Sequence, residues 1–104
     1  MNLNLNGLTA LVTASTGGIG LEIARSLAIE GVRVIVNGRT QSSVEKALTE
    51  LRRDLSNADL VGLAADNGTV GGCATTLSTW PQVDILVNNL GIYEAIGFFD
   101  ETDG

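Results

Sequence analysis

Histidine is absent from this sequence, and cysteine occurs once, at Cys73. Zinc centres draw most of their ligands from these two residue types, and a disulfide needs two cysteines, so the sequence supports neither kind of site. A lone cysteine is also typical of proteins that stay in a reducing compartment. We therefore expect a cytoplasmic protein that holds no metal.

Basic residues and long apolar segments are scarce as well. Six lysines and arginines stand against twelve aspartates and glutamates, which gives a net charge of −6. This balance argues against general binding of nucleic acid or of a membrane surface. No apolar run approaches the roughly 20 residues of a membrane span, and the first ten residues lack the basic side chains of a secretory signal. We expect neither nucleic acid nor membrane as a partner.

Proline occurs once, at Pro81, whereas glycine occurs thirteen times. Glycine at this density indicates tight turns and close backbone approaches, and it does not suggest a proline-rich linker. The chain has 104 residues, of which 44% are hydrophobic and 17% charged, and this composition is typical of one compact folded domain.

Four short apolar runs alternate with three helical patterns. Strand-forming residues fill positions 8–13, 32–36, 60–64 and 83–87. Apolar residues at helical spacing occupy 19–31, the segment that follows a capping box of Ser42 and Glu45, and 67–79. This alternation predicts an α/β fold of the Rossmann type, with a parallel sheet of order 3-2-1-4 and helices on both faces. Asn37-Gly38 also fits a hairpin turn, but a capped helix follows it instead of a second strand.

A polar or glycine-rich segment follows each predicted strand. In order along the chain, these segments are Thr13 to Gly20, Asn37 to Thr40, Asp66-Asn67, and Asn88 to Gly91. Ligands of open parallel sheets bind beyond the carboxyl ends of the strands, so all four segments are expected at one binding edge. In the first segment, glycines allow close approach to a pyrophosphate, and the helix that starts near Ile19 offers free N–H groups. Taken alone, these glycines are also compatible with a purely structural turn.

These motifs resemble the N-terminal part of the short-chain dehydrogenase/reductase family, Rossmann-fold enzymes that use nicotinamide cofactors. Thr13 to Gly20 matches its Thr-Gly-x-x-x-Gly-Ile-Gly motif, with Ala14 in place of the first glycine. Asn88 to Gly91 matches its Asn-Asn-Ala-Gly motif, with Leu90 in place of alanine, and Asp66 matches its adenine-contacting aspartate. The similarity covers essentially all 104 residues. The departure at Ala14 requires either a negative φ or backbone strain.

The resemblance implies that residues 15–20 hold the phosphates of a dinucleotide. The implied cofactor-binding residues are Ala14, Thr16, Gly17, Gly18, Ile19, Gly20, Asn37, Arg39, Thr40, Asp66, Asn67, Asn89, Leu90 and Gly91.

The residues after the second strand favour NADP over NAD. An acidic residue there would bind the adenosine ribose hydroxyls and select NAD, but that position carries Gly38, and Arg39 follows it. An arginine can pair with the 2′-phosphate of NADP and lie over the adenine, with Thr40 as a helper. Many NADP-preferring relatives also have a basic residue at the position of Gly17, so here the phosphate contact depends on Arg39. The alternative for Arg39 is a solvated surface side chain.

The catalytic half of the family has no match in this chain. The family's catalytic tyrosine precedes a lysine by four residues, whereas Gly97 follows Tyr93 at that distance and the single lysine is Lys46. We therefore expect residues 1–104 to be the NAD(P)-binding Rossmann domain of an oxidoreductase, truncated before its catalytic half and inactive alone. The complete protein would transfer a hydride between NADP(H) and a small alcohol or carbonyl substrate, as a homo-oligomer. The alternatives are a non-catalytic dinucleotide-binding fragment that pairs with another chain and, more distantly, a methyltransferase.

Overall fold

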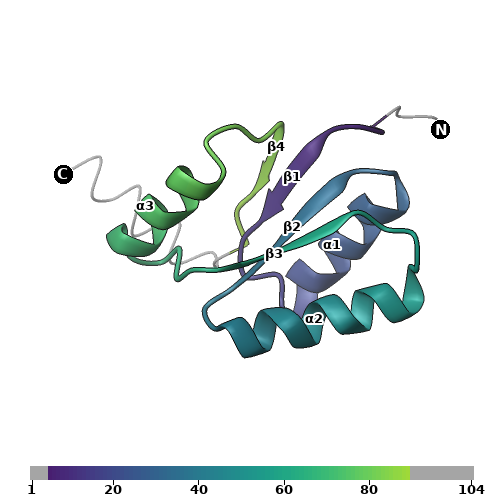
Figure 1. The fold of residues 1–104 in the computed structure, drawn as a ribbon, viewed down its shortest axis with the longest axis horizontal. Coiled ribbons are helices and arrows are strands. Elements are labelled where there is room, and N and C mark those ends of the chain that lie inside the picture. Colours follow the sequence, from purple (N-terminus) through teal and green to yellow (C-terminus); the bar gives the residue numbers. More distant parts are fainter. Residues whose placement is uncertain (1–4, 90–104) are drawn as a thin grey trace.

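A computed structural model describes residues 5–89, which form a parallel sheet of four strands with three helices (Figure 1). The strand order is β3-β2-β1-β4, and every pair is parallel, as the sequence predicts. Within residues 5–89, no helix is long and apolar enough to cross a membrane. The elements in chain order are β1 (Thr9–Val12), α1 (Gly18–Ile29), β2 (Arg33–Gly38), α2 (Gln41–Asp54), β3 (Leu60–Ala64), α3 (Val70–Thr79) and β4 (Ile85–Val87).

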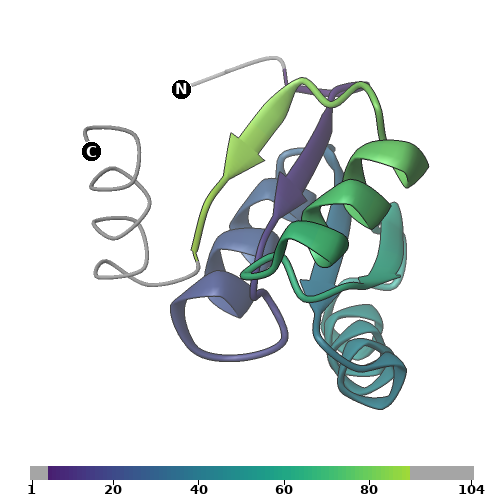
Figure 2. The same ribbon diagram turned by 90° about the vertical axis from the view of Figure 1, so that its left-hand side faces the viewer.

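Helices α1 and α2 cover one face of the sheet, and α3 lies on the other (Figures 1 and 2). Alternate residues of a strand point to opposite faces, so each strand contributes to two clusters. The larger cluster lies under α1 and α2 and includes Ala10, Val12, Ala24, Val34, Val36, Val44, Leu48 and Leu51. The smaller cluster contains Leu11, Ile35, Leu63 and Ala65, with Trp80 and Val83 packed against it. Burial on both faces explains why the central strands read as continuous apolar runs.

The start of α2 differs from the sequence prediction. Helix α2 begins at Gln41, and its N-cap is Thr40, whose hydroxyl accepts a hydrogen bond from the Ser43 N–H at 3.2 Å. The predicted capping box of Ser42 and Glu45 is therefore wrong. Thr40 stands three residues before Ser43 and has extended backbone angles, so it satisfies the free N–H groups two residues earlier than expected.

The predicted hairpin alternative at Asn37-Gly38 is also excluded. Strand β2 continues through Gly38, which pairs with Ala64 of the parallel strand β3. The chain then enters α2 directly. Asn37-Gly38 therefore ends a central strand at the carboxyl edge of the sheet.

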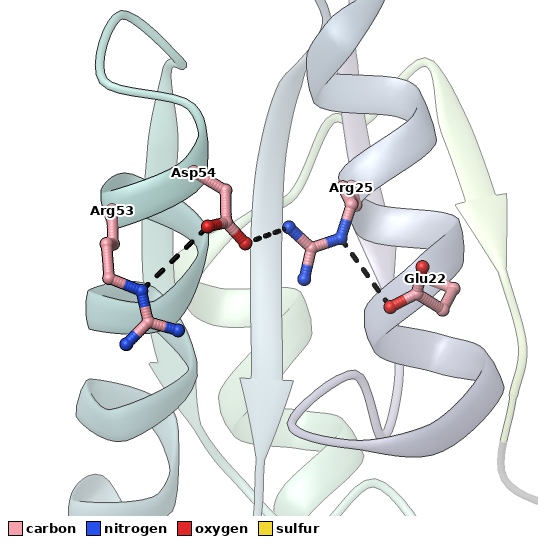
Figure 3. Close-up of polar contacts among 4 residues, drawn as sticks. All are labelled: Glu22, Arg25, Arg53 and Asp54. Atoms are coloured by element: carbon pink, nitrogen blue, oxygen red, sulfur yellow. Dashed lines mark hydrogen bonds and ion pairs between the residues drawn. The ribbon is translucent and has the colours of Figure 1, made fainter.

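A chain of ion pairs connects α1 to the last turn of α2 (Figure 3). Arg25 Nη1 lies 2.6 Å from Asp54 Oδ2, and Arg25 Nε lies 3.5 Å from Glu22 Oε2. Asp54 Oδ1 also lies 3.8 Å from Arg53 Nε. The hydrogen bond to Asp54 raises the pKa of the Arg25 guanidinium above its ordinary value, and the pair links α1 to α2.

Candidate functional site

Asn37 ties together the ends of three strands at the carboxyl edge. Its side-chain Nδ2 donates to the carbonyl oxygens of Leu63 and Ala65, both at 3.0 Å, and its Oδ1 accepts from the Ala14 N–H at 3.1 Å. The residue is only 2% exposed. The sequence placed Asn37 among the cofactor-binding residues, but all of these amide contacts are internal. Asn37 therefore has a structural role at this edge, because its side chain connects the ends of β1, β2 and β3 by hydrogen bonds.

Ser15 also connects the ends of β1 and β2, and the sequence analysis assigned it no separate role. It is fully buried, and its hydroxyl donates to the Val12 carbonyl at 2.8 Å and accepts from the Asn37 N–H at 2.9 Å. The Ser15 N–H donates in turn to the Asn37 carbonyl at 2.8 Å. A short polar side chain inside a glycine-rich loop carries no local signal of burial, so only the contact with β2 reveals its function.

Ala14 adopts the left-handed backbone conformation, with φ of +50°. The sequence analysis left open whether this departure from glycine takes a negative φ or strain, and the structure shows strain. The conformation is held from both sides, because the Ala14 N–H binds Asn37 and the Ala14 carbonyl accepts from Asn89 Nδ2 at 3.2 Å. Strain of this kind persists where neighbouring contacts determine the backbone path.

The first and last of the four segments meet through Thr13 and Asn89. The Asn89 N–H donates to Thr13 Oγ1 at 2.7 Å. A Cβ added to Gly20 would overlap Asn89 Nδ2 and lie 2.5 Å from the Ala14 carbonyl oxygen. Glycine at position 20 therefore lets the first turn of α1 lie directly against both segments. Leu90 and Gly91, the remaining residues of the last motif, lie outside the described residues.

The N-terminus of α1 is open to an anion. Its N-cap, Gly17, has an extended backbone and provides no side-chain cap, and the first turn contains no acidic residue. Gly17, Gly18 and Ile19 are all exposed, Ile19 to 74%. The first N–H groups of a helix lack intrahelical partners and carry the positive end of its dipole. An exposed glycine-rich turn over such groups fits the pyrophosphate of a dinucleotide.

Arg39 and Thr40 follow β2 at the same edge. Arg39 is exposed and has no hydrogen bond or ion pair to any residue in the range 5–89. The Thr40 hydroxyl is already used, because it caps α2 and lies 2.9 Å from Ser43 Oγ. Arg39 is thus the group at this position that is free to meet a ligand.

Asp66 and Asn67 form the turn between β3 and α3. Asp66 Oδ1 accepts from the Gly68 N–H at 3.0 Å, while Asn67 Oδ1 accepts from the Thr76 hydroxyl at 2.5 Å. Asn67 Nδ2 is buried and has no partner in the described part of the chain. A Cβ on Gly72 would overlap the backbone carbonyl of Asp66, so glycine at position 72 holds this turn close to α3.

Comparison with known proteins agrees with the geometry of this edge. A family model described as short chain dehydrogenase matches residues 8–103. The chain is 52% identical over 103 residues to the uncharacterized oxidoreductase YvaG of Bacillus subtilis. This match covers 99% of this chain and 39% of that protein. It is 38% identical over 101 residues to the D-beta-hydroxybutyrate dehydrogenase of Cupriavidus necator, with 92% of this chain and 38% of that protein covered.

A solved structure supports the same relation. The L-sorbose reductase of Gluconobacter frateurii, complexed with NADPH and L-sorbose, superposes with a TM-score of 0.76 at 30% identity and covers 88% of this chain and 36% of its own. The chain thus spans about 39% of the length of the curated relatives named above. The glycine-rich segment is bonded to Asn89 at the carboxyl edge of a 3-2-1-4 sheet, and the family model matches residues 8–103, so this chain belongs to the short-chain dehydrogenase/reductase family.

Proposed function

We propose that residues 1–104 are the cofactor-binding part of an NADP(H)-dependent oxidoreductase that acts on a small alcohol or carbonyl substrate. Family membership and the oxidoreductase relatives support the reaction class. The L-sorbose reductase, which was solved with NADPH, supports the choice of a nicotinamide dinucleotide. A cytoplasmic location and a homo-oligomeric complete protein remain predictions.

Arg39 carries the proposal for NADP. The other four arginines have partners: Arg25, Arg33 and Arg53 form ion pairs with carboxylates, and Arg52 donates to the Leu60 carbonyl. Arg39 is the one arginine that has no hydrogen bond or ion pair within residues 5–89, although carboxylates outnumber basic side chains in this protein, whose net charge is −6. An exposed guanidinium without a carboxylate partner among these residues is available to a phosphate, and it follows the strand-end position that in dinucleotide-binding sheets meets the adenosine ribose.

Other residues at the edge would bind the rest of the dinucleotide. The exposed N–H groups at the start of α1 would hold the pyrophosphate, and Asp66 and Asn89 lie at the ends of the flanking strands. Gly20 lets α1 begin directly against this loop, because a Cβ there would overlap Asn89 Nδ2 and the Ala14 carbonyl oxygen. A nicotinamide bound there would give or accept the hydride. Lys46, the single lysine, lies on α2 after β2, so we do not assign it the proton exchange with the substrate oxygen.

The test is dinucleotide binding by the full-length protein, measured by calorimetry with NADPH and NADH. A charge-assisted contact of Arg39 with a phosphate predicts that Arg39→Ala weakens NADPH binding by about 10- to 150-fold and leaves NADH binding nearly unchanged. Arg53→Ala is the matched control, because its side chain is 71% exposed and lies at the opposite end of α2. Equal losses for both dinucleotides would contradict a 2′-phosphate contact.

A further inference from the structure

Thr16 fills the space beside Gly38, at the end of β2. A Cβ added to Gly38 would overlap the methyl carbon of Thr16, and it would lie 3.0 Å from Ser43 Oγ and 3.2 Å from Val44 Cγ2. These neighbours come from the glycine-rich loop and from α2, so residue 38 is enclosed from two directions. Residue 38 therefore has no room for a side chain while Thr16 keeps its position.

The backbone at residue 38 does not itself require glycine. Among the described residues, positive φ angles occur only at Ala14, Gly7, Gly18 and Gly31. Gly38 is the last residue of a regular strand, and its carbonyl accepts from the Ala65 N–H at 2.9 Å. An L-residue could adopt this conformation, so lack of space, not backbone geometry, explains the glycine.

Thr16 is the neighbour that decides whether the space opens. Ser43 Oγ is held by the Thr40 carbonyl at 3.0 Å, and Val44 is fully buried. The Thr16 hydroxyl, in contrast, has no hydrogen bond within residues 5–89. Cβ of a threonine carries a methyl, a hydroxyl and a hydrogen, so two of its three staggered rotamers direct a heavy atom at residue 38.

Residue 38 is the position at which an acidic side chain would bind the adenosine ribose and select NAD. We propose that Thr16 is a specificity-determining residue: its methyl group leaves no room for a side chain at residue 38, so a carboxylate introduced there cannot reach the ribose and Arg39 alone meets it. This inference rests on the proposed dinucleotide site. It also means that Gly38→Asp by itself does not convert the protein to NAD.

The steric part is tested without any cofactor, by thermal unfolding of the full-length protein. Gly38→Ala is introduced into the wild type, into Thr16→Val, which keeps a methyl group, and into Thr16→Ala, which removes it. Thr16→Val and Thr16→Ala both lack the hydroxyl, so these two variants differ only in the methyl groups on Cβ of residue 16. We expect Gly38→Ala to lower Tm by about 3–8 °C in the wild type and in Thr16→Val, and by no more than about 1 °C in Thr16→Ala. Equal losses in all three overturn the inference and leave the proposed function standing.

The specificity part is tested with Gly38→Asp in the same three backgrounds, by calorimetry with NAD and NADP. We expect at least about 10-fold tighter NAD binding only with Thr16→Ala. A gain in every background, or no gain with Thr16→Ala, overturns the inference. If Gly38→Asp alone unfolds the protein, restored folding in Thr16→Ala supports the inference, and continued unfolding there overturns it. A wild type that binds neither dinucleotide overturns the proposed function and this inference with it.

Discussion

Ala14 is the residue at which a single substitution should stabilise the protein. It is the one described non-glycine residue with a positive φ, +50°, and its N–H and carbonyl are both bonded, to Asn37 and Asn89. Left-handed geometry costs an L-residue about 1–2 kcal/mol, and glycine adopts it freely. Glycine also gains about 0.4–1 kcal/mol of freedom in the unfolded chain, which opposes the gain. Ala14→Gly should therefore raise the free energy of unfolding by about 0.5–1 kcal/mol.

The assay is urea unfolding of the full-length protein, with the midpoint compared at constant slope. Ala74→Gly is the control, because Ala74 is exposed inside α3 and its φ is not positive. Glycine in a helix interior costs roughly 0.5–1 kcal/mol, so the two substitutions should shift the midpoint in opposite directions. A loss at Ala14 as large as the loss at Ala74 would refute the strain argument.

Three further outcomes follow from the structure. Gly72→Ala should destabilise the protein by more than about 3 kcal/mol, because its Cβ would overlap the Asp66 carbonyl; a loss below about 1 kcal/mol in urea unfolding would show that the turn yields easily. Asp54→Asn should lower the urea midpoint slightly at low salt and have less effect at high salt, because the pair with Arg25 is partly exposed and screened; a loss that does not depend on salt would mean that this ion pair is not the cause. Residues 1–104 expressed alone should not oxidise NADPH with any ketone or aldehyde, because they lack the family's Tyr–Lys spacing; turnover that disappears on mutation of Lys46 would show that the chemistry lies in this chain.

Most of the fold was predicted from local patterns in the sequence. Apolar runs and helical spacing predicted the order of the elements, and the crossover rule then gave the strand order that the structure shows. The capping prediction failed at α2 because Thr40, Ser42 and Ser43 are all good capping residues in sequence. Which of them caps the helix depends on where β2 ends. Strand β2 ends at Gly38, and α2 begins at Gln41, so Thr40 is the N-cap.

The site prediction divides in the same way. The sequence identified the segments that meet at the carboxyl edge, because the ends of parallel strands always share one edge. It could not show that Asn37 faces inward while Arg39, two residues later, faces solvent without a partner among residues 5–89.

By itself, the sequence determined the family and the order of the elements, and it predicted the carboxyl edge of the sheet as the place of the site, because spacing and glycine-rich motifs are local features of the sequence. Only the tertiary structure decided that Ala14 is strained, that Gly72 lies against Asp66 and that the Thr16 methyl group lies where a side chain of residue 38 would begin. These three features are contacts or backbone angles imposed by the close packing of segments after folding, and close packing leaves no signature in a local pattern of residues.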